Sequence, residues 1–412
     1  MVDEVKKKPK LNRDWIDFDA HEIVKKLQRN GFLTYLVGGC VRDLLAGIPP
    51  KDFDIATNAL PRQVKTFIYN SFIIGRRFRL VLVKRGLKQF EVATFRREVR
   101  PDEFPEGVPP GDNIFGSPAE DAQRRDFTVN ALFYDPIKDE IVDYCDGLSD
   151  IKNRVIRVIG DPNTRMIEDP IRILRALRLA HKLSFTIEPS LRGAMLTNAS
   201  ELTKSALPRR REEILKILRL SDPLMALQEA HDLGLLQHLA PTLDEVFKSP
   251  ETSQNFSSYM HRFHNIVGDP ANPVELFAVL GLAFYRTMIE ADPYQVKSID
   301  EILENPLILS LFRDELGLFN LEQKFIAKAL HQQPELLKTR EKTLDTAPQA
   351  ESPRPSLVNN ESFGVTLLMA YADHLISPSE LFFWKKEYEK AIQKLRSRPS
   401  SRGRRFSRGP RR

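Results

Sequence analysis

The sequence predicts an α+β fold, with a small mixed sheet flanked by helices in the first half of the chain and a helical array in the second. Short β-rich runs alternate with amphipathic helical segments up to about residue 160. From about residue 163 onward, strand patterns become scarce and apolar residues recur at helical spacing. The 412 residues, of which 42% are hydrophobic and 29% charged, suffice for several cores and exclude a wholly disordered or fibrous protein.

The elements expected in the first half follow each other in strand, turn and helix order. Residues 19–30 predict a helix with Asp19 as its N-cap and a stop at Asn30-Gly31. A strand over Leu33–Val37 ends at two glycines, and the short helix VRDLLA follows. The remaining expected elements are a strand over Asp52–Ala56, a helix over Pro61–Asn70, strands over Arg79–Lys84 and Gln89–Thr94, and a long loop from Arg96 to Ser117.

The second half predicts helices joined by short connections. They are expected over Ile167–Leu183, Arg209–Leu220, Pro223–Leu239, Pro273–Ile289 and Asn320–Leu330. Residues 339–356 have the composition of a flexible linker, and a further apolar segment, Leu357–Leu395, comes after it. No internal repeat is evident.

Cysteine usage and the apolar runs bear on the compartment. Cys40 and Cys145 are too few for a disulfide framework or a zinc site, and their spacing fits no metal motif. The first residues, MVDEVKKKPKLNRDW, are charged, and no apolar run reaches the roughly 18 residues that span a bilayer. These features favour a cytoplasmic protein with no export signal and no transmembrane segment.

Asp52 and Asp54 carry the strongest local signal for chemistry. Carboxylates at i and i+2 on a strand point to the same face, where their repulsion is costly unless a cation lies between them. Hard oxygen ligands of this kind favour Mg²⁺, which commonly bridges to substrate phosphates. The alternative is a polar turn after Pro49-Pro50-Lys51, and for an isolated pair of aspartates that alternative is the commoner outcome.

A glycine turn precedes these aspartates by some thirteen residues. Gly38 and Gly39 are placed to let backbone N–H groups approach phosphate oxygens, and Arg42 would add further donors. A pair of glycines is weak evidence by itself. Next to the two aspartates in one small domain, it predicts a nucleoside triphosphate site with metal ions on Asp52 and Asp54.

Two further segments have both a structural and a functional interpretation. Glu91 is an acid within an apolar strand, so it either faces solvent on an edge strand or reaches the same metal ions. The string Arg124-Arg125-Asp126 precedes an apolar segment, and Asp126 or Thr128 would cap a following helix in the structural interpretation. Spacing alone does not decide between the two in either case.

The helix expected from Glu168 to Leu183 has arginine at every third position over Arg172, Arg175 and Arg178. In the structural interpretation, these arginines form the solvated face of an ordinary amphipathic helix. In the functional one, Arg172 with Asp169 meets the polar edge of a base, and Arg175 and Arg178 reach phosphates. Arginine rather than lysine at all three positions favours the functional interpretation.

Together these segments resemble the nucleotidyltransferases of the polymerase-β superfamily, in particular the eubacterial group of poly(A) polymerases and tRNA CCA-adding enzymes. The matching strings, in the expected order, are LVGGCVRDLLAG, PKDFDIAT, FEVATFR, EDAQRRDFTVNAL, GDPNTRMIEDPIRILRALRLA and PRRREEILKIL. They cover about residues 33–218, roughly half of the chain. IGRRFRLVLV and DNIFGSPAEDAQRRDFT are similar to the poly(A) polymerase branch, with one departure at Leu82, where that branch often has histidine.

The resemblance implies a role for each matching residue. Asp52, Asp54 and Asp126 match catalytic aspartates, of which Asp52 and Asp54 bind metal, with Glu91 in the strand of a third metal-site carboxylate. The implied nucleotide-binding positions are Gly38, Gly39, Arg42, Arg125, Asp169, Arg172, Arg175 and Arg178. The implied cofactor is a pair of Mg²⁺ ions, with ATP as substrate.

The resemblance also implies a domain order of nucleotidyltransferase head, helical neck, body and tail. On this sequence the expected divisions are an N-terminal extension (1–18), the head (19–160), the neck (161–220), the body (221–338), a linker (339–356), a C-terminal helical segment (357–395) and a basic disordered tail (396–412). The implied activity is template-independent addition of AMP from ATP to RNA 3′ ends, with RNA-decay proteins as partners. A CCA-adding tRNA nucleotidyltransferase and a non-catalytic RNA-binding protein remain as alternatives.

The net positive charge that would favour a nucleic-acid partner is located in the C-terminal residues. The chain carries +6, and the segment from Lys394 to Arg412 alone holds nine basic and no acidic residues. We expect this tail to hold RNA phosphates near the active site without reading sequence. A tail that serves solubility, or that binds a membrane surface, is the alternative.

Overall fold

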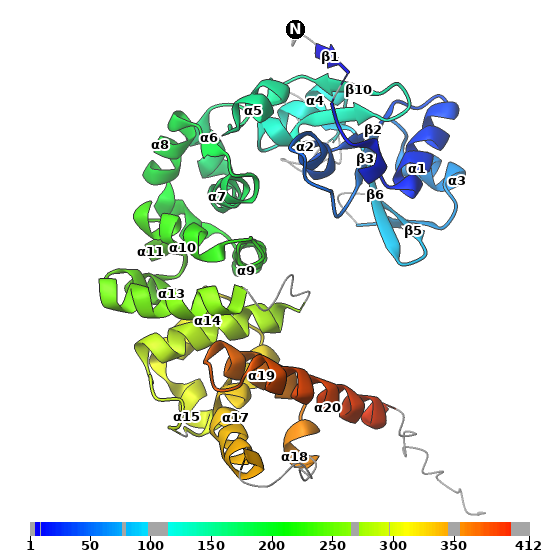
Figure 1. The fold of residues 1–412 in the computed structure, drawn as a ribbon. Helices are drawn as coiled ribbons and strands as arrows, with labels where there is room; N and C mark the ends of the chain where they lie inside the picture. Colours follow the sequence, from blue (N-terminus) through cyan, green and yellow to red (C-terminus); the bar gives the residue numbers. More distant parts are fainter. Residues whose placement is uncertain are drawn as a thin grey trace, which may run out of the picture. The chain divides into compact units, whose positions relative to one another are not determined.

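The computed structural model describes residues 5–8, 10–75, 80–97, 114–264, 272–295, 297–344 and 355–396. They form two compact units, Met1–Glu201 and Leu202–Arg412, of which the first holds the sheets and the second is helical (Figure 1). The predicted α+β class is confirmed. The boundary at Glu201 falls within the predicted neck, so the finer division into neck, body and tail stays a prediction. The basic tail from 397 to 412 and the centre of the predicted linker, 345–354, lie outside the described residues.

The main sheet of the first unit is mixed. Within the described residues its order is β1 (Val5–Lys7), β10 (Glu140–Asp143), β9 (Leu132–Asp135), β2 (Thr34–Val37), β3 (Asp54–Thr57), β6 (Lys88–Thr94), β5 (Leu80–Arg85) and β4 (Ser71–Ile74). All neighbours are antiparallel except β3 and β6, which pair in parallel with Asp54 opposite Glu91. Two small sheets pair β7 (Arg96–Arg97) with β8 (Ile114–Phe115) and β11 (Val155–Ile156) with β12 (Thr186–Ile187).

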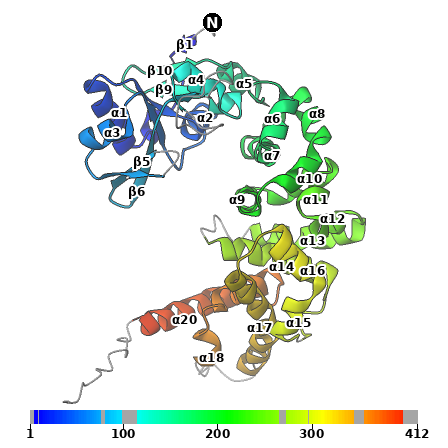
Figure 2. The ribbon, with the colours of Figure 1, turned by 180° about the vertical axis from the view of Figure 1, so that it is seen from behind.

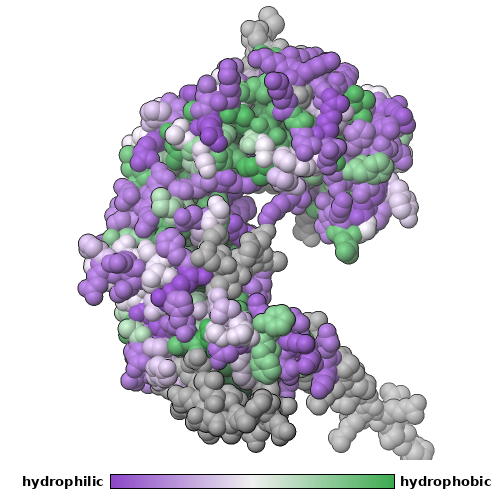
Figure 3. All heavy atoms as spheres, in the orientation of Figure 1, coloured by the Kyte–Doolittle hydropathy of each residue, from purple (hydrophilic) through white to green (hydrophobic). Residues whose placement is uncertain are grey.

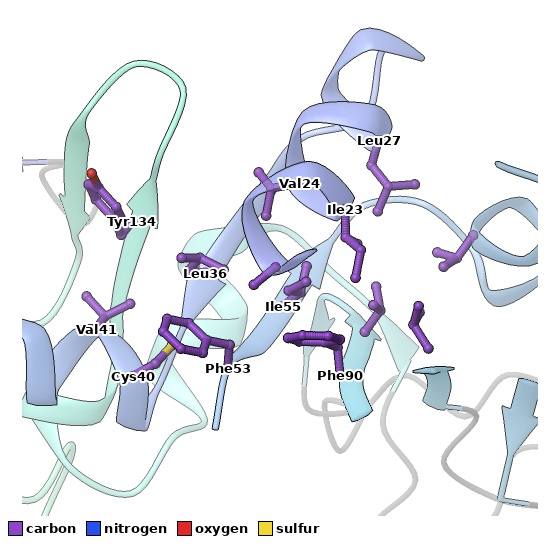
Figure 4. Packing of buried hydrophobic residues seen from close by; sticks show 14 of the residues in the cluster. Ile23, Val24, Leu27, Leu36, Cys40, Val41, Phe53, Ile55, Phe90 and Tyr134 are labelled. Atoms are coloured by element: carbon purple, nitrogen blue, oxygen red, sulfur yellow. The ribbon is translucent and has the colours of Figure 1, made fainter. Parts of the chain in front are cut away.

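The helices of the first unit lie on either side of this sheet or lead away from it. They are α1 (Phe18–Arg29), α2 (Gly39–Leu45), α3 (Pro61–Phe67), α4 (Pro118–Gln123), α5 (Gly147–Asn153), α6 (Pro162–Glu168), α7 (Ile171–Leu183) and α8 (Pro189–Thr197). Figure 2 shows α1 and α3 side by side. Figure 4 shows α1 and its sheet neighbours in contact through Ile23, Val24, Leu27, Leu36, Ile55 and Phe90.

Side-chain alternation gives the sheet two apolar faces. Leu36 and Ile55 belong to the core beneath α1, whereas Val37 and Ala56, one residue further along each strand, belong to a second cluster with Phe133. Because alternate residues of a strand share a face, Asp54 lies on the side of Ala56. The candidate site is therefore on the face opposite α1.

The second unit is helical throughout its described residues. Its helices are α9 (Leu207–Leu218), α10 (Pro223–Asp232), α11 (Leu236–Leu239), α12 (Pro241–Asp244), α13 (Pro250–His264), α14 (Pro273–Met288), α15 (Ile299–Glu304), α16 (Pro306–Leu309), α17 (Asn320–Leu344), α18 (Pro355–Val358), α19 (Phe363–Ala372) and α20 (Pro378–Arg396). On the face drawn in Figure 3, hydrophilic residues predominate, and apolar residues lie between them. No helix among the described residues is long and apolar enough to cross a membrane.

Several predicted boundaries in the first unit are wrong for identifiable reasons. Asp17, not Asp19, caps α1, because its carboxylate accepts the N–H groups of Asp19 and Ala20. The predicted N-terminal extension includes β1, which pairs with β10 at one edge of the sheet. The predicted long loop begins and ends with β7 and β8, while 98–113 lie outside the described residues.

The strand predicted over Asp52–Ala56 begins two residues later than predicted, at Asp54. Val37 pairs with Asp54, and beyond that pair the chain of β2 turns at Gly38 into α2. Residues 52 and 53 therefore lack a β2 partner, and Asp52 lies just outside β3. The expectation that both aspartates share a strand is wrong.

Proline and glycine end or split several predicted helices. The helix predicted over Ile167–Leu183 is two helices, because Pro170 has no N–H and forces Asp169 out of helical geometry, to φ −148° and ψ 88°. The helix predicted over Pro223–Leu239 is likewise two, with Gly234 at φ 63° between them. In the other direction, α17 extends past the predicted Leu330 to Leu344, into the predicted linker.

Candidate active site

The turn between β2 and α2 forms one wall of the site. Gly38 has φ 74° and ψ −132°, a backbone conformation that residues other than glycine rarely adopt. A Cβ there would lie 3.3 Å from Arg125 Nη1 and 3.8 Å from Asp54 Oδ2. The fold thus brings Gly38, Asp54 and Arg125 together from three separate segments.

Asp54 has a perturbed titration. Partial burial of its carboxyl group, followed by the negative charge of Glu91, raises its pKa to about 6; Arg125 opposes the shift and Asp52 adds to it. The residue as a whole nonetheless remains exposed, so a cation can reach it. β6 lies between β3 and β5, so the expected edge strand for Glu91 is wrong, but its side chain is exposed to solvent as that interpretation expects. In the parallel register Glu91 lies opposite Asp54.

The donor chemistry at Asp52 and Asp54 fits a divalent cation. Two hard carboxylates lie near each other, their repulsion contributes to the raised pKa of Asp54, and among the described residues no ion pair engages either side chain. However, no group of three or more His, Cys, Asp or Glu side chains in the described part of the chain is arranged to hold a metal ion. The metal-binding roles of Asp52, Asp54 and Glu91 stay predictions.

Arg42 is engaged within the protein. Its guanidinium is buried and donates to Asp43 Oδ1 from Nε at 2.8 Å and from Nη2 at 2.6 Å, and to Asn130 Oδ1 from Nη1 at 2.6 Å. Asp43 in turn accepts from Lys182 Nζ at 2.7 Å. Asp43 thus joins α2 to α7, whereas Arg42 joins α2 to Asn130. A Cβ at Gly39 would lie 3.5 Å from Arg42 Nη2, so the guanidinium packs close to the glycine turn.

Arg125 is held from three sides. Its Nε and Nη2 donate to Asp121 Oδ2 at 3.2 and 2.9 Å, its Nη1 donates to the Asn130 carbonyl at 3.2 Å, and its guanidinium carbon lies 5.3 Å from the centre of the Phe133 ring. Asp121 also accepts from Arg124 Nε at 3.0 Å. These contacts direct one edge of the guanidinium toward the glycine turn.

Asp126 lies in an ion pair with Arg175, whose side chain is 37% exposed. The Asp126 Oδ2 to Arg175 Nη2 distance is 2.5 Å, and Oδ1 accepts from Phe127 N at 2.8 Å and from Asn130 Nδ2 at 3.0 Å. Burial alone would raise the pKa of Asp126, but Arg175 and these donors together hold it below its ordinary value. Neither Asp126 nor Thr128 caps a regular α-helix here, so the capping interpretation is wrong, and a catalytic role of Asp126 stays a prediction.

The arginines of α7 do not form a solvated face. Arg172, Arg175 and Arg178 are each half-buried. Arg172 donates to the Arg165 carbonyl at 2.8 Å and to Glu168 Oε2 at 3.2 Å, and burial lowers its pKa. Asp169, the C-cap residue of α6, lies near Arg172, and the role of the two residues in base recognition stays a prediction.

Several residues to which the sequence analysis assigned no role have central positions. Asn130 contacts Arg42, Arg125 and Asp126, and the buried Arg165 donates to the carbonyls of Arg124 and Arg125 at 3.2 and 3.0 Å. Both belong to strings already matched to the superfamily. A polar residue within an apolar stretch, for Asn130, and within a short helix, for Arg165, is the sequence pattern that could have indicated their roles.

Residues 34–157 match the family described as "Poly A polymerase head domain". Residues 184–247 match a second family, described as "Probable RNA and SrmB- binding site of polymerase A". Two stretches of this chain are therefore similar to poly(A) polymerase domains. These matches agree with the resemblance inferred from the ordered motifs.

The chain is similar to curated poly(A) polymerases and to curated CCA-adding enzymes. Poly(A) polymerase I of Salmonella typhi is 41% identical over 260 residues, 61% of this chain and 55% of that protein. The CCA-adding enzyme of Lactobacillus delbrueckii subsp. bulgaricus is 39% identical over 218 residues, 52% of this chain and 54% of that protein. The chain thus spans little more than half the length of these relatives.

Solved structures share the fold. The CCA-adding enzyme of Bacillus stearothermophilus, solved in complex with CTP, superposes with a TM-score of 0.63 at 23% identity, over 92% of this chain and 88% of that one. At this identity the match establishes the common fold alone.

Proposed function

We propose that this chain is a template-independent polynucleotide adenylyltransferase that transfers AMP from ATP to the 3′ ends of RNA. The observation that carries the proposal is the positive-φ turn at Gly38, set between the carboxylate of Asp54 and the guanidinium of Arg125. A turn without side chains admits a phosphate closely, the cation attracts it, and the carboxylates complete a site for a metal-bound triphosphate. Similarity to Poly(A) polymerase I supports ATP as the nucleotide.

Asp52 and Asp54 would hold the two Mg²⁺ ions of the proposal. When bound, these ions would lower the pKa of the RNA 3′-hydroxyl and neutralise negative charge on the departing pyrophosphate. Asp54 must be ionised for this role. With its pKa raised to about 6, it is mostly ionised at neutral pH without any further base.

The remaining residues orient the nucleotide. Backbone N–H groups of the Gly38-Gly39 turn donate to the triphosphate, and Arg125 stabilises its negative charge. Arg42, whose donors are used inside the protein, supports the turn rather than contacting phosphate. Arg172 with Asp169, at the start of α7, reads the base edge, and Arg175 acts through its pair with Asp126. Arg178 extends the same arginine row and would reach the phosphates of the nucleotide or of RNA.

RNA is the proposed acceptor, and residues 184–247 are the proposed contact region, given their match to an RNA-binding family. ATP and RNA meet in the cytoplasm, where we place the activity, and RNA-decay proteins are proposed partners. A CCA-adding activity on tRNA is the second candidate, favoured by 39% identity to a CCA-adding enzyme.

Nucleotide selection tests the proposal. The purified full chain with Mg²⁺ would be offered a generic RNA oligonucleotide or a tRNA lacking its 3′ end, together with ATP, CTP or both. We expect a long ladder on generic RNA from ATP alone. Addition that is confined to tRNA and that needs CTP would replace the proposal by CCA addition, and binding of RNA without any incorporation would indicate a non-catalytic RNA-binding protein.

A further inference from the structure

Asp121 is a buried acid that two arginines share. It lies in α4, is 3% exposed, and accepts four hydrogen bonds. The donors are Arg96 N at 3.1 Å, Arg124 Nε at 3.0 Å, and Arg125 Nε and Nη2 at 3.2 and 2.9 Å. An acid that only complemented the dipole of α4 would need none of these partners and would remain in solvent.

The two bonds from Arg125 reach the same oxygen of Asp121. With Nε and Nη2 both on Oδ2, the guanidinium cannot rotate about its Cδ–Nε bond without breaking one of them. The remaining nitrogen, Nη1, is then directed to the Asn130 carbonyl and to the open side of Gly38. Within the described residues, Asp121 makes no hydrogen bond or ion pair to that turn, so any effect it has on a ligand there passes through Arg125.

A second buried acid of the same unit provides the contrast. Asp143 is 4% exposed, and it accepts from the backbone N–H groups of Cys145, Gly147 and Leu148 at 2.9 to 3.1 Å. Its role is to hold a backbone turn. Asp121, equally buried, is instead bonded mainly to side chains that carry charge.

We propose that Asp121 is a positioning residue, which fixes the guanidinium of Arg125 in the orientation that binds the triphosphate at the Gly38 turn. The inference rests on the proposed function for the identity of the ligand. The carboxylate fixes the geometry of the cation, and the cation contacts the phosphates. Loss of the carboxylate removes two of the three hydrogen bonds that orient the Arg125 guanidinium and leaves its charge in place, so nucleotide binding weakens while the chemistry at Asp54 is spared.

The test measures ATP affinity by calorimetry in the absence of RNA, followed by kcat and KM for ATP with RNA. Asp121→Asn is expected to raise both the Kd and the KM for ATP about tenfold, equivalent to about 1.4 kcal/mol, with a smaller change in kcat. Asp143→Asn is the matched control, because it removes an equally buried charge. It is expected to lower thermal stability and to leave the ATP affinity of the folded protein unchanged.

A double-mutant cycle separates positioning from general disruption. Arg125→Ala should weaken ATP binding at least as much as Asp121→Asn, and the double variant should bind no more weakly than Arg125→Ala alone. Additive losses, or equal losses of affinity in Asp121→Asn and Asp143→Asn, would overturn the inference.

A second variant covers the case in which Asp121→Asn does not fold. Arg125→Lys keeps the charge but cannot make the paired contact with Asp121, so its ATP affinity should fall nearly as far as that of Arg125→Ala. Wild-type affinity in Arg125→Lys would contradict the inference. ATP binding is measured without RNA, so the two proposals can fail separately. A chain that binds ATP but extends no RNA would refute the proposed activity. The double-mutant cycle on ATP affinity would still decide the role of Asp121.

Discussion

Replacement of Gly38 by alanine tests the geometry of the site most directly. Its backbone, at φ 74° and ψ −132°, lies in a region that residues with a Cβ enter only at a cost of about 1–3 kcal/mol. The new Cβ would also lie 3.3 Å from Arg125 Nη1, which is closer than ordinary van der Waals contact, so Arg125 must move. We therefore expect Gly38→Ala to lower both the free energy of unfolding and the affinity for ATP.

Gly31→Ala is the matched control for backbone strain. Gly31 has φ 84°, and a Cβ there would meet nothing within 4 Å. It should cost about 1–2 kcal/mol of stability for its left-handed backbone but leave ATP affinity unchanged. Urea denaturation and calorimetric titration with ATP measure the two effects separately.

Two outcomes would refute this reasoning. If the free energy of unfolding of Gly38→Ala lay within about 0.5 kcal/mol of the wild-type value, a side chain at this turn would cause no strain. A destabilised Gly38→Ala protein that binds ATP as well as wild type would mean that Arg125 and the turn do not form the nucleotide site.

Three further predictions concern charge. Asp54→Asn should abolish nucleotide incorporation on RNA gels, whereas Asp14→Asn, at an exposed position of the same unit, should not; appreciable turnover by the former would contradict a metal role. Because the folded pKa of Asp54, about 6, lies above the unfolded value of about 3.8, the folded state binds the extra proton, so this group's contribution to stability falls as pH rises between these values. Asp54→Asn should therefore be more stable than wild type at pH 7, with the difference vanishing below about pH 4, as thermal melts at both pH values would show. In the helical unit, Asp373→Ala should lose about 3–5 kcal/mol because it leaves Arg286, 2.7 Å away and buried, unpaired; Asp314→Ala, in the exposed pair with Arg313, should change the urea midpoint little, and equal losses would refute the distinction.

Local sequence patterns predicted most helices and strands of the fold. They failed for strands that form only by pairing with strands distant in sequence. Apolar periodicity and glycine or proline stops located β2, α2, α3 and β6 to within a few residues, because these signals act within one element. The strands β1, β4, β9 and β10 were missed, because they exist through pairing with strands distant in sequence. The late start of β3 has the same origin, since its partner β2 ends at Val37.

The sequence by itself determined the chemistry available to this protein: the paired aspartates, the glycine turn, the arginine row of α7 and the order of motifs that resembles the polymerase-β nucleotidyltransferases. Only the tertiary structure decided how these groups are used. It placed Arg42 and Asp126 in internal ion pairs, Arg125 between Asp121 and Gly38, and Glu91 beside Asp54. The physical reason is that a charge removed from water must find a partner, and which partner it finds depends on strand register and helix packing rather than on neighbours in the sequence.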